Sequence, residues 1–413
     1  MNSLIAKKLA SPELRFSTFQ EPWRFHRLGE IGILKNGLNK DKSDFGFGFP
    51  FINLMDVFGQ TIYEPKPLSL VNASPKDLGS YNLQAGDVLF IRSSVKREGV
   101  AEAILIPQTL PQTVFSGFLI RFRQTKSILA TSFKRYVFGT TAFRKQVLAY
   151  ATTSANTNIN QESLAEAGVY MPAIVEQEKI ANFLTAVDQR IQQLIEKKAL
   201  LEDYKKGVMQ QLFTQAIRFK DDHGNDFPDW EEKKLGEVAS VIGGGTPDSK
   251  NEAYWNGNVQ WFTPTEIRTK YTSRSRRNIS DLGLKKCSAT LLPIGTILFT
   301  SRATIAEVSI ATEQCTTNQG FQSIKVNPDT SNEFIYYWVI QFRKDFLRKS
   351  QGSTFREIGG KEVRKMSIFI PNFPEQTKIA NFLAAIDQKI ETVASQITET
   401  QTFKRGLLQQ MFV

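Results

Sequence analysis

Apolar residues at alternating steps of three and four positions mark two long stretches of the chain. These residues are Ile180, Leu184, Val187, Ile191, Leu194, Leu201, Val208 and Leu212 in the first stretch, and Ile379, Leu383, Ile386, Ile390, Val393, Ile397, Leu407 and Met411 in the second. This spacing is the heptad pattern of coiled coils, so it predicts two long paired helices, over 171–215 and 371–413. A helix of about 40 residues is roughly 60 Å long, more than the about 34 Å of one turn of B-DNA, so the pair could act as a rigid spacer.

Polar residues interrupt the heptad pattern in both stretches. They are Lys198, Lys205, Thr400 and Lys404. A polar residue at such a position either fixes the register of the helices or extends its polar end to solvent, and we favour the second interpretation.

The rest of the chain has a different pattern. Residues 23–170 and 230–370 contain short apolar and β-branched runs separated by Gly, Pro, Asn and Asp, such as 87–91, 100–106 and 296–300, and they predict mixed β-structure with some helix. A helix is expected over Phe334–Lys349, aromatic on one side and basic on the other, with a counterpart over Ser127–Tyr150. The predicted fold class is therefore α/β (α+β).

The chain repeats itself once. Pro172, Glu176, Gln177, Lys179, Ile180, Ala181, Asn182, Phe183 and Leu184 recur, in the same order and spacing, as Pro371, Glu375, Gln376, Lys378, Ile379, Ala380, Asn381, Phe382 and Leu383. The match continues through Asp188 and Asp387 to Gly207 and Gly406, and the halves also begin alike, around Trp23 and Trp230. Between these parts the halves share little, as expected of a protein that does one job on two different targets.

Composition and charge narrow the class of protein. The chain of 413 residues is 41% hydrophobic and 23% charged, which is typical of a folded protein with two or three domains. Its net charge of +11 favours a polyanionic partner such as nucleic acid. With two cysteines, no C-x-x-C pair, no secretory signal and no long apolar run, the protein is expected in the cytoplasm and not in a membrane.

Three motifs resemble type I restriction-modification specificity subunits. They are E-Q-x-K-I-A-N-F-L-x-A-[VI]-D-Q at Glu176 and Glu375, the K-[KR]-G-[VL]-[ML]-Q-Q-[LM]-F endings, and the linker R-F-K-D-D-H-G-N-D-F-P-D-W that starts at Arg218. The resemblance covers the full length. The Gly243–Pro247 loop, followed by Trp255 and Trp261, also resembles a common start of a target-recognition domain.

The resemblance implies an architecture and a set of partners. Two mixed α/β target-recognition domains, 1–170 and 216–370, would be separated by an antiparallel pair of long coiled-coil helices, 171–215 and 371–413, with pseudo-two-fold symmetry. Each domain would read one half of a bipartite, asymmetric site in double-stranded DNA. The chain would position two modification subunits, which use S-adenosylmethionine to methylate adenine N6, and restriction subunits, which use ATP and Mg to cleave unmodified DNA. No cofactor, metal or catalytic residue is expected in this chain.

The residues themselves also give no support for catalysis. We find neither a D/N-P-P-Y/F type motif nor a glycine-rich cofactor loop, and we interpret Phe45–Gly48 as a turn. Pro228, Asp229, Glu231 and Lys233 weakly resemble a nuclease motif, but we interpret them as a solvated linker. His26 and His223 lie beside no plausible nucleophile or set of metal ligands.

Candidate DNA contacts are basic and amide side chains in loops, because these groups bind phosphates and base edges. In the first half they are Asn39, Lys40, Lys42, Arg92, Lys96, Arg97, Asn156 and Asn158, and in the second half Arg268, Lys270, Arg274, Arg276, Arg277, Arg302, Asn318, Gln319 and Arg356. The basic run from Arg268 is the densest candidate, and a solvated loop is its alternative. At least one of Asn156, Asn158 and Asn160 is expected to cap a turn.

Residues of the long helices have two candidate roles, packing between the helices and docking of the modification subunits. They are Asn182, Leu184, Val187, Gln189, Ile191, Leu194, Asn381, Leu383, Ile386, Gln388, Ile390 and Val393. The apolar members suit packing and the repeated polar members suit docking, although packing at the helix ends explains the polar ones nearly as well. Two rival functions remain open, a structural coiled-coil adaptor and an unrecognised nuclease.

Overall fold

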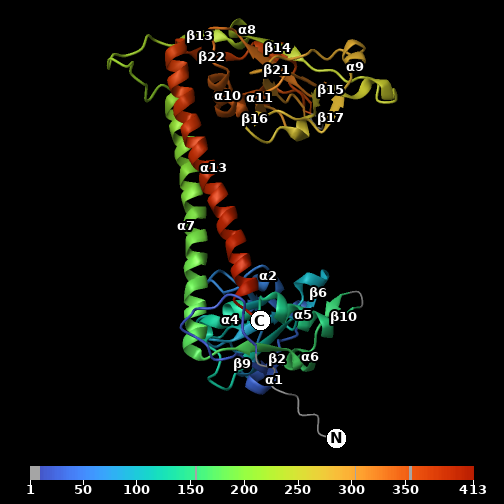
Figure 1. Ribbon diagram of the computed structural model, residues 1–413, viewed down its shortest axis with the longest axis vertical. Helices are drawn as coiled ribbons and strands as arrows, with labels where there is room; N and C mark the ends of the chain where they lie inside the picture. Colours follow the sequence, from blue (N-terminus) through green and yellow to red (C-terminus); the bar gives the residue numbers. More distant parts are fainter. Residues whose placement is uncertain (1–9, 154–155, 303, 353–355) are drawn as a thin grey trace. The chain divides into compact units, whose positions relative to one another are not determined.

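The computed structural model describes residues 10–153, 156–302, 304–352 and 356–413, and these form two compact units. Unit 1 comprises residues 1–195 and 395–413, and unit 2 comprises residues 196–394. The long helices α7 (Ile174–Phe213) and α13 (Phe373–Gln410) are green and red in Figure 1. Each unit therefore contains a part of both helices, packed against a mixed α/β domain, and the predicted fold class and long helices are confirmed.

Unit 1 holds its domain on a four-stranded sheet in the order β2-β9-β5-β7. Two three-stranded sheets, β4-β3-β8 and β10-β11-β6, and the pair β1-β12 complete it. The strands are β1 Arg24–Arg27, β2 Gly32–Asn36, β3 Phe45–Ile52, β4 Ser69–Val71, β5 Val88–Ile91, β6 Ser93–Ser94, β7 Ala103–Leu105, β8 Val114–Phe115, β9 Leu119–Gln124, β10 Thr152–Thr153, β11 Thr157–Asn158 and β12 Gly168–Met171. The shorter helices are α1 Leu28–Ile31, η1 Lys42–Asp44, α2 Leu54–Val57, α3 Pro75–Ser80, η2 Arg97–Gly99, α4 Thr131–Val137, α5 Thr141–Tyr150 and α6 Gln161–Glu166.

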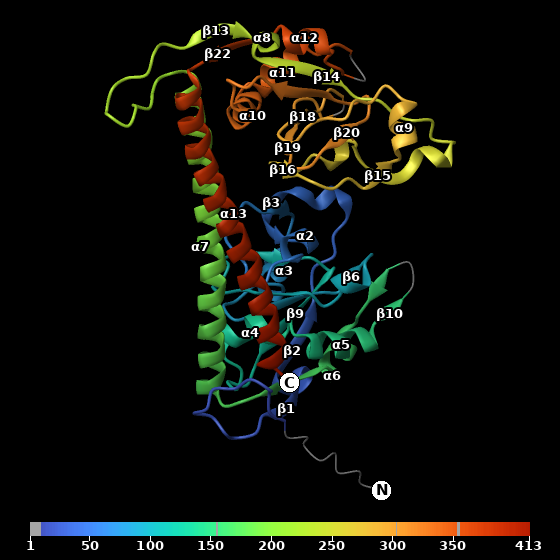
Figure 2. The ribbon, with the colours of Figure 1, turned by 45° about the horizontal axis from the view of Figure 1, so that its top comes forward.

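Unit 2 has a five-stranded sheet in the order β14-β21-β18-β19-β16, a three-stranded sheet β17-β15-β20 and the pair β13-β22 (Figure 2). The strands are β13 Glu231–Lys234, β14 Ala239–Gly243, β15 Trp255–Phe262, β16 Tyr271–Thr272, β17 Arg277–Ile279, β18 Ile297–Phe299, β19 Val308–Ala311, β20 Cys315–Thr317, β21 Gln322–Val326 and β22 Ser367–Ile370. The shorter helices are α8 Leu235–Val238, η3 Glu252–Tyr254, η4 Pro264–Glu266, α9 Asp281–Lys285, α10 Asn332–Gln341, α11 Arg343–Lys349 and α12 Gly360–Arg364.

The single helix predicted over Phe334–Lys349 is wrong, because the chain bends at Phe342 and forms α10 and α11. The bend lets Phe346 of α11 pack against Phe299 of β18, with ring centroids 5.0 Å apart. The counterpart over Ser127–Tyr150 is likewise broken into α4 and α5. Core packing outweighs helix continuity here, because each half-helix turns its own aromatic residue into the sheet.

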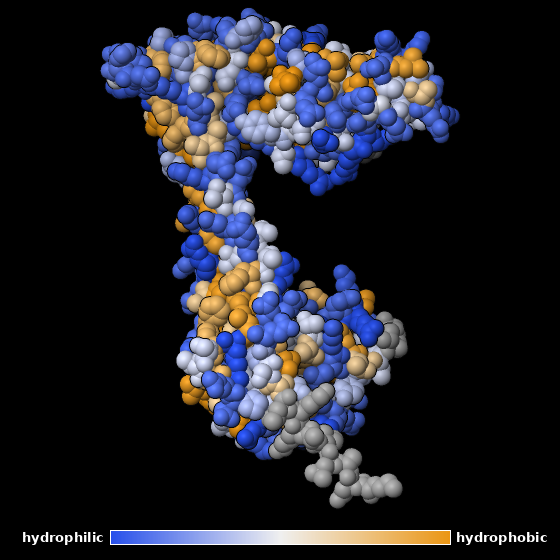
Figure 3. All heavy atoms as spheres, viewed as in Figure 1, coloured by the Kyte–Doolittle hydropathy of each residue, from blue (hydrophilic) through white to orange (hydrophobic). Residues whose placement is uncertain are grey.

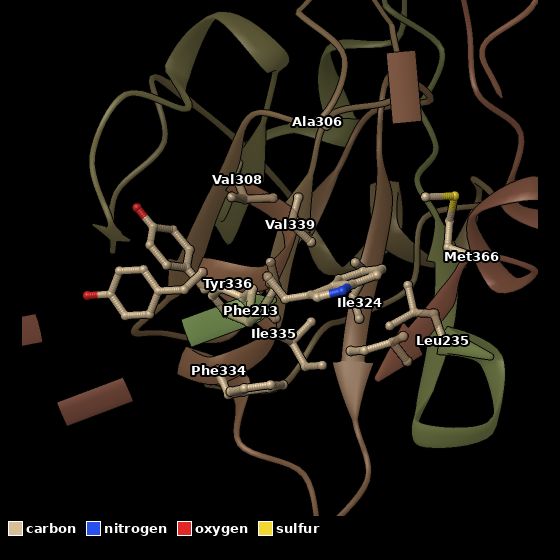
Figure 4. Packing of buried hydrophobic residues seen from close by; sticks show 14 of the residues in the cluster. Phe213, Leu235, Ala306, Val308, Ile324, Phe334, Ile335, Tyr336, Val339 and Met366 are labelled. Carbon is tan, nitrogen blue, oxygen red and sulfur yellow. The ribbon is translucent and has the colours of Figure 1, made fainter. Parts of the chain in front are cut away.

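The core of unit 2 shows how the long helix joins the domain. Phe213 of α7, Phe334 and Ile335 of α10 and Ile324 of β21 belong to one buried cluster (Figure 4). Six consecutive residues of α10, from Phe334 to Val339, are buried, so this helix has no basic face, and the basic residues lie in α11 instead. The helix end is therefore part of the domain core.

Candidate nucleic-acid interface

In each unit, three loops and a backbone-paired segment ahead of the long helix gather at one end of the sheet. In unit 1 the backbone of Arg92, just after β5, donates to Phe118 O (2.8 Å) and accepts from Ile159 N (2.9 Å). In unit 2 Ser301, just after β18, donates to Gly320 O (2.7 Å) and accepts from Ile358 N (3.0 Å). The two units thus have the same backbone frame at this end, with Arg92 in the place of Ser301.

The loop after the first sheet strand is held against this frame by a glycine. A Cβ atom on Gly37 would lie 2.1 Å from Ser116 O, and one on Gly244 would lie 2.0 Å from Asn318 O. Both distances exclude any side chain, so both positions require glycine. We call the two assemblies loop surface 1 (residues 37–39, 92–96, 116–118 and 156–158) and loop surface 2 (residues 244–246, 301–302, 318–320 and 356–357).

A segment ahead of each long helix pairs along its backbone with the loop surface. In unit 1, β11 pairs with β6, with Asn158 opposite Ser93. In unit 2, Glu357 pairs with Arg302 along the backbone, and their side chains form an ion pair of 3.0 Å. Arg302 is thus equivalent to Ser93, one position after Arg92.

The loop surfaces bring together part of the predicted set of DNA contacts. Loop surface 1 contains Asn39, Arg92, Lys96, Asn156 and Asn158, and loop surface 2 contains Arg302, Asn318, Gln319 and Arg356. Some of these side chains also hold the loops. The Arg92 guanidinium donates to Gly117 O (3.3 Å), and Asn318 Oδ1 accepts from Gly320 N (2.8 Å).

Three further candidates in unit 1 are engaged close by. Lys40 forms an ion pair of 3.2 Å with Asp77, whose pKa is lowered by hydrogen bonds from Ser74 and by Lys40. Lys42 begins the short helix η1, and the Arg97 guanidinium lies 3.5 Å from Leu148 O. Asn160 caps α6 by accepting from Ser163 N (2.7 Å), which confirms that one asparagine of this segment is a cap.

The basic run in unit 2 divides into exposed and internal residues. Arg268, Arg274, Arg276 and Arg277 are exposed, and the Arg277 guanidinium lies 3.7 Å from the ring centroid of Trp255. Lys270 differs, because its side chain is only 9% exposed and its ammonium binds Glu333 (2.7 Å) and the Tyr337 hydroxyl (3.0 Å). Its charge is thus used inside the unit, and we leave it out of the proposed DNA contacts.

The helices carry one repeated charge cluster in each unit. In unit 1, Asp188 of α7 binds Lys404 of α13 (2.5 Å), Arg135 (3.1 Å) and the Tyr136 hydroxyl (3.0 Å). In unit 2, Asp387 of α13 binds Lys205 of α7 (2.5 Å) and the Tyr337 hydroxyl (2.6 Å). Burial raises the pKa of Tyr136 to about 12, so its hydroxyl remains a donor at neutral pH.

Two of the polar interruptions of the heptad pattern therefore form specific ion pairs. Lys205 and Lys404 bind aspartates of the other helix, so extension of their ammonium groups to solvent is the wrong interpretation for these two. Lys198 instead pairs with Glu202 one turn away on its own helix (2.6 Å), and the Thr400 hydroxyl donates to Gln396 O (2.6 Å).

The predicted helix residues divide by burial as their chemistry suggested. The apolar ones are buried or nearly so, among them Leu184, Val187 and Leu194 in α7 and Leu383, Ile386 and Val393 in α13, with Ile191 and Ile390 packed beside the cores. Asn182, Gln189, Asn381 and Gln388 are exposed. Packing inside the chain does not account for these four repeated polar residues.

The residues that anchor each domain to its helix were not among the predicted site residues. Glu176 is buried and binds the Arg15 guanidinium (2.7 and 2.8 Å) and Trp23 Nε1 (3.3 Å). Glu375 binds Arg218 (3.2 and 2.8 Å) and Trp230 Nε1 (3.1 Å) in the same way. Repetition of the Arg, Trp and Glu in both halves was the available signal.

The nuclease-like segment is a linker only at Pro228 and Asp229; for Glu231 and Lys233 that interpretation is wrong, because they lie in β13 and pair along the backbone with β22. Asp229 is fully exposed and lies 3.5 Å from the Arg218 guanidinium, and Glu231 pairs with Lys233 (2.8 Å). Among the described residues, no group of three or more His, Cys, Asp or Glu could hold a metal ion. None of the helices in the described part of the chain is both long and apolar enough to cross a membrane.

Comparison with known proteins gives one consistent match. The family described as "Type I restriction modification DNA specificity domain" matches residues 20–202 and 228–400. The type I restriction enzyme MjaIX specificity subunit of Methanocaldococcus jannaschii is 36% identical over 49% of this chain and 48% of its own length, so the match spans about half of that relative. The putative MjaX specificity subunit of the same organism is 24% identical over 94% of this chain and 92% of its own.

Solved structures show the same fold. A chain from a study of complex assembly and conformational transition of the type I R-M system has a TM-score of 0.62 at 17% identity, covering 98% of both chains. The HsdS subunit of Thermoanaerobacter tengcongensis has a TM-score of 0.54 at 18% identity, covering 94% of this chain and 95% of its own.

Proposed function

The chain belongs to the family of type I restriction-modification specificity subunits, and on that premise we propose that loop surfaces 1 and 2 contact double-stranded DNA, each at one half of a split, asymmetric site. Specificity subunits determine DNA sequence recognition in their complex and are not themselves catalytic. The observation that carries the proposal is that both units present the same backbone frame with different side chains on it. A repeated frame with different contents suits one binding mode applied to two different half-sites.

The exposed charges on or near the loop surfaces support a division of roles. Arg302 and Arg356 on loop surface 2, and Arg274 and Arg276 in the basic run, offer cations for phosphate contacts. Lys96 does so on loop surface 1, where Arg92 is half-buried and donates to Gly117 O. Neutral side chains such as Asn39 and Gln319 suit the base edges, because an amide both donates and accepts hydrogen bonds.

An exchange of one domain tests the proposal. Replacement of residues 23–170 by the corresponding domain of another specificity subunit is expected to change one half of the methylated site and leave the other half intact. Methylome sequencing of a host that expresses the chain with its modification subunit measures both halves in one experiment. A change in both halves, or methylation by the purified chain alone, would contradict the proposal.

The partner surface also follows from the repeat. The repeated residues of the helices that lie outside the cores include Asn182, Ala186, Gln189, Gly207, Gln210 and Gln211 in α7, and Asn381, Ala385, Gln388, Gly406, Gln409 and Gln410 in α13. Gly406 is half-buried and the others are exposed, and Tyr204 and Phe403 form a similar exposed aromatic pair. Residues at successive steps of three and four share one helix face. In Figure 3 apolar and polar side chains alternate along the helix surface.

These residues combine into one patch in each unit. Because Lys404 pairs with Asp188 across the antiparallel helices of unit 1, Phe403 and Gly406 lie near the level of Gln189 and Ala186. The same face of unit 2 carries Tyr204 and Gly207 beside Gln388 and Ala385, since Lys205 pairs with Asp387. Two like patches suit two copies of one partner, which we identify as the modification subunit.

Glycine at the centre of each patch supports close approach of that partner. A Cβ atom on Gly207 or Gly406 would meet nothing within 4 Å, so the chain itself does not require glycine there. Glycine inside a helix costs about 1 kcal/mol relative to alanine, so a role outside the chain is a physical reason for its presence in both copies.

Gly207→Leu tests the patch in unit 2. The substitution favours the helix, yet its side chain should block the partner and reduce the bound modification subunits from two to one, as measured by the mass of the purified complex. Lys197→Leu is the matched control, because Lys197 is exposed on the same helix and differs from its counterpart, Gln396. Two bound subunits in the Gly207→Leu complex would contradict this docking site.

The proposed partners carry the cofactors. S-adenosylmethionine would bind the modification subunits, and ATP and Mg the restriction subunits, while this chain binds DNA in the cytoplasm and holds the partners on it. The helices would set the length of the unread gap between the half-sites, because α7 and α13 are each a single continuous helix, roughly 60 Å long at 1.5 Å per residue.

A further inference from the structure

The two loop surfaces place a carboxamide at the same position, although it comes from different segments. Gly37 and Gly244 occupy equivalent places against the frame, so the residues two positions later, Asn39 and Thr246, are equivalent. Phe118 and Gly320 are also equivalent, since their carbonyl groups accept from the residue that follows β5 or β18. The residues before them, Gly117 and Gln319, are therefore equivalent as well. Each loop surface thus has one pair of equivalent positions, with Asn39 or Thr246 as its first member and Gly117 or Gln319 as its second.

In loop surface 1 the carboxamide belongs to the first member of the pair. A Cβ atom on Gly117 would lie 1.8 Å from Asn39 Oδ1, so the Asn39 side chain fills the space that a side chain at 117 would need. Asn39 itself is exposed to solvent. Glycine at 117 is thus required for the carboxamide of Asn39 to lie there.

In loop surface 2 the carboxamide belongs to the second member. Gln319 is exposed, and its Oε1 accepts from the Thr246 hydroxyl at 2.6 Å. That contact orients the amide and still leaves one lone pair of Oε1 and both hydrogens of Nε2 for a ligand. The loop is also fixed from within, because Thr316 and Thr317 are buried and Asn318 Oδ1 accepts from Gly320 N.

We propose that Asn39 and Gln319 are the specificity-determining side chains of the two half-sites, and that each reads the adenine of an A·T pair in the major groove. A carboxamide can accept from adenine N6 and donate to adenine N7 at once, a pair of bonds that no other base offers in that arrangement. The proposal rests on the proposed function, in which the loop surfaces contact DNA. It adds which residue reads and which base is read.

Methylome sequencing of single substitutions tests the proposal in the intact complex with the modification subunit. Gln319→Ala is expected to relax one A·T position in one half of the methylated site, and Asn39→Ala to relax one A·T position in the other half. Gln319→Glu replaces the donor by a second acceptor, so the same position should shift from adenine toward cytosine, whose N4 amine donates. Both residues are exposed, so none of these substitutions removes core packing.

Gln314→Ala is the matched control. Gln314 is an exposed glutamine at the opposite end of β20 from Gln319, and its loss is expected to leave the site unchanged. If a variant methylates too little DNA to score, competition binding of the purified complex decides instead, with affinity for the A·T site expected to fall about ten-fold while the other base pairs bind equally well.

Three results would overturn the proposal. They are an unchanged methylated site in Gln319→Ala and Asn39→Ala, relaxation at a G·C position, and relaxation of the same half-site by both substitutions. Each of these leaves the two-surface function intact if exchange of residues 23–170 still changes one half-site. Failure of that exchange would overturn the proposed function itself.

Discussion

At the start of α7 and of α13 a buried glutamate binds an arginine and a tryptophan, and three turns later an aspartate binds a lysine of the other helix. The loop surfaces contrast with this. They share a backbone frame, but Asn39 and Gly117 stand where the other unit has Thr246 and Gln319. The difference shows that the repeat preserves the groups that hold a domain on the helices and varies the exposed groups of the loop surfaces.

One internal position departs from this rule. Lys134 of α4 is buried and donates to Gly86 O (2.8 Å), whereas its counterpart in α10 is Ile335, which is completely buried in an apolar core. In unit 2 the carbonyl of Gly295 accepts instead from Asn332 Nδ2 (3.0 Å). The same turn is thus stabilised by an ammonium in one unit and by an amide in the other.

The glutamate anchors give the largest expected effect. Glu375→Ala should lower the free energy of unfolding of unit 2 by about 3–5 kcal/mol, because it leaves the Arg218 charge and Trp230 Nε1 without their buried acceptor. Glu176→Ala should cost a similar amount in unit 1. Chemical denaturation measures both, and Glu231→Ala, which removes an exposed pair, is the control. A loss below about 1 kcal/mol in one variant alone would show that the two anchors are not equivalent, and a loss that small in both would contradict the prediction.

The aspartate clusters should differ modestly between the units. Asp188→Ala leaves two cations, Lys404 and Arg135, facing each other and should cost about 3 kcal/mol, whereas Asp387→Ala leaves Lys205 beside the neutral Tyr337 and should cost about 2 kcal/mol. Thermal or urea unfolding of the two variants checks the order. Equal losses would mean that Arg135 contributes nothing to the cluster of unit 1.

Lys134 should make the stability of unit 1 depend on pH. Burial lowers the pKa of Lys134 from its ordinary 10.5 to about 8, with Asp87 opposing the shift. Between these two values the unfolded chain binds more protons than the folded one, so this residue makes stability rise with pH from about 8 to 10.5 and leaves a constant penalty below 8.

Lys134→Met should abolish this rise and stabilise unit 1 at pH 7 by about 1–2 kcal/mol, since the lost hydrogen bond to Gly86 offsets part of the gain. Urea unfolding at pH 7 and pH 10 measures both effects. Ile335→Met in unit 2 is the control without a pH dependence. An unchanged slope in Lys134→Met would show that other groups cause the rise.

The smallest effect is expected where the repeats differ on the helix surface. Lys198→Ala removes an exposed pair with Glu202 and should change stability by about 0.3–0.5 kcal/mol, the value of such a pair within a helix. The same unfolding measurement checks it. A loss as large as that of Asp387→Ala would mean that charges in the non-repeated middle of α7 also hold the fold.

The sequence predicted the long helices well because their signal is local and long. Apolar residues at alternating steps of three and four over many positions are compatible with a long helix and not with a strand. Both ends of α7 and α13 lie within three residues of the predicted limits. The helix over Phe334–Lys349 failed because its pattern is equally compatible with two helices. The packing of Phe346 on Phe299 selects the bend, and that contact joins residues far apart in the chain.

The loop surfaces show the same limit. Asn39, Gln319 and Arg302 could be chosen from the sequence as polar loop residues. Nothing local indicated that the carboxamides of Asn39 and Gln319 occupy one equivalent position, because Asn39 lies early in the sequence of its domain and Gln319 lies late in the sequence of the other. Lys270 lies in the same basic run as the exposed arginines, and the sequence therefore predicted it as a DNA contact. Its ammonium group instead binds Glu333 and the Tyr337 hydroxyl inside the unit.

The sequence by itself determined the family, the duplication and the two helices. The family and the duplication follow from residue identities, and the helices follow from the spacing of apolar residues. Only the tertiary structure decided which polar and basic side chains are exposed on the loop surfaces and which hold the fold. The physical reason is that exposure depends on residues brought together from distant parts of the chain. Asp387 binds the ammonium group of Lys205, and Gly117 leaves the space that the Asn39 side chain occupies.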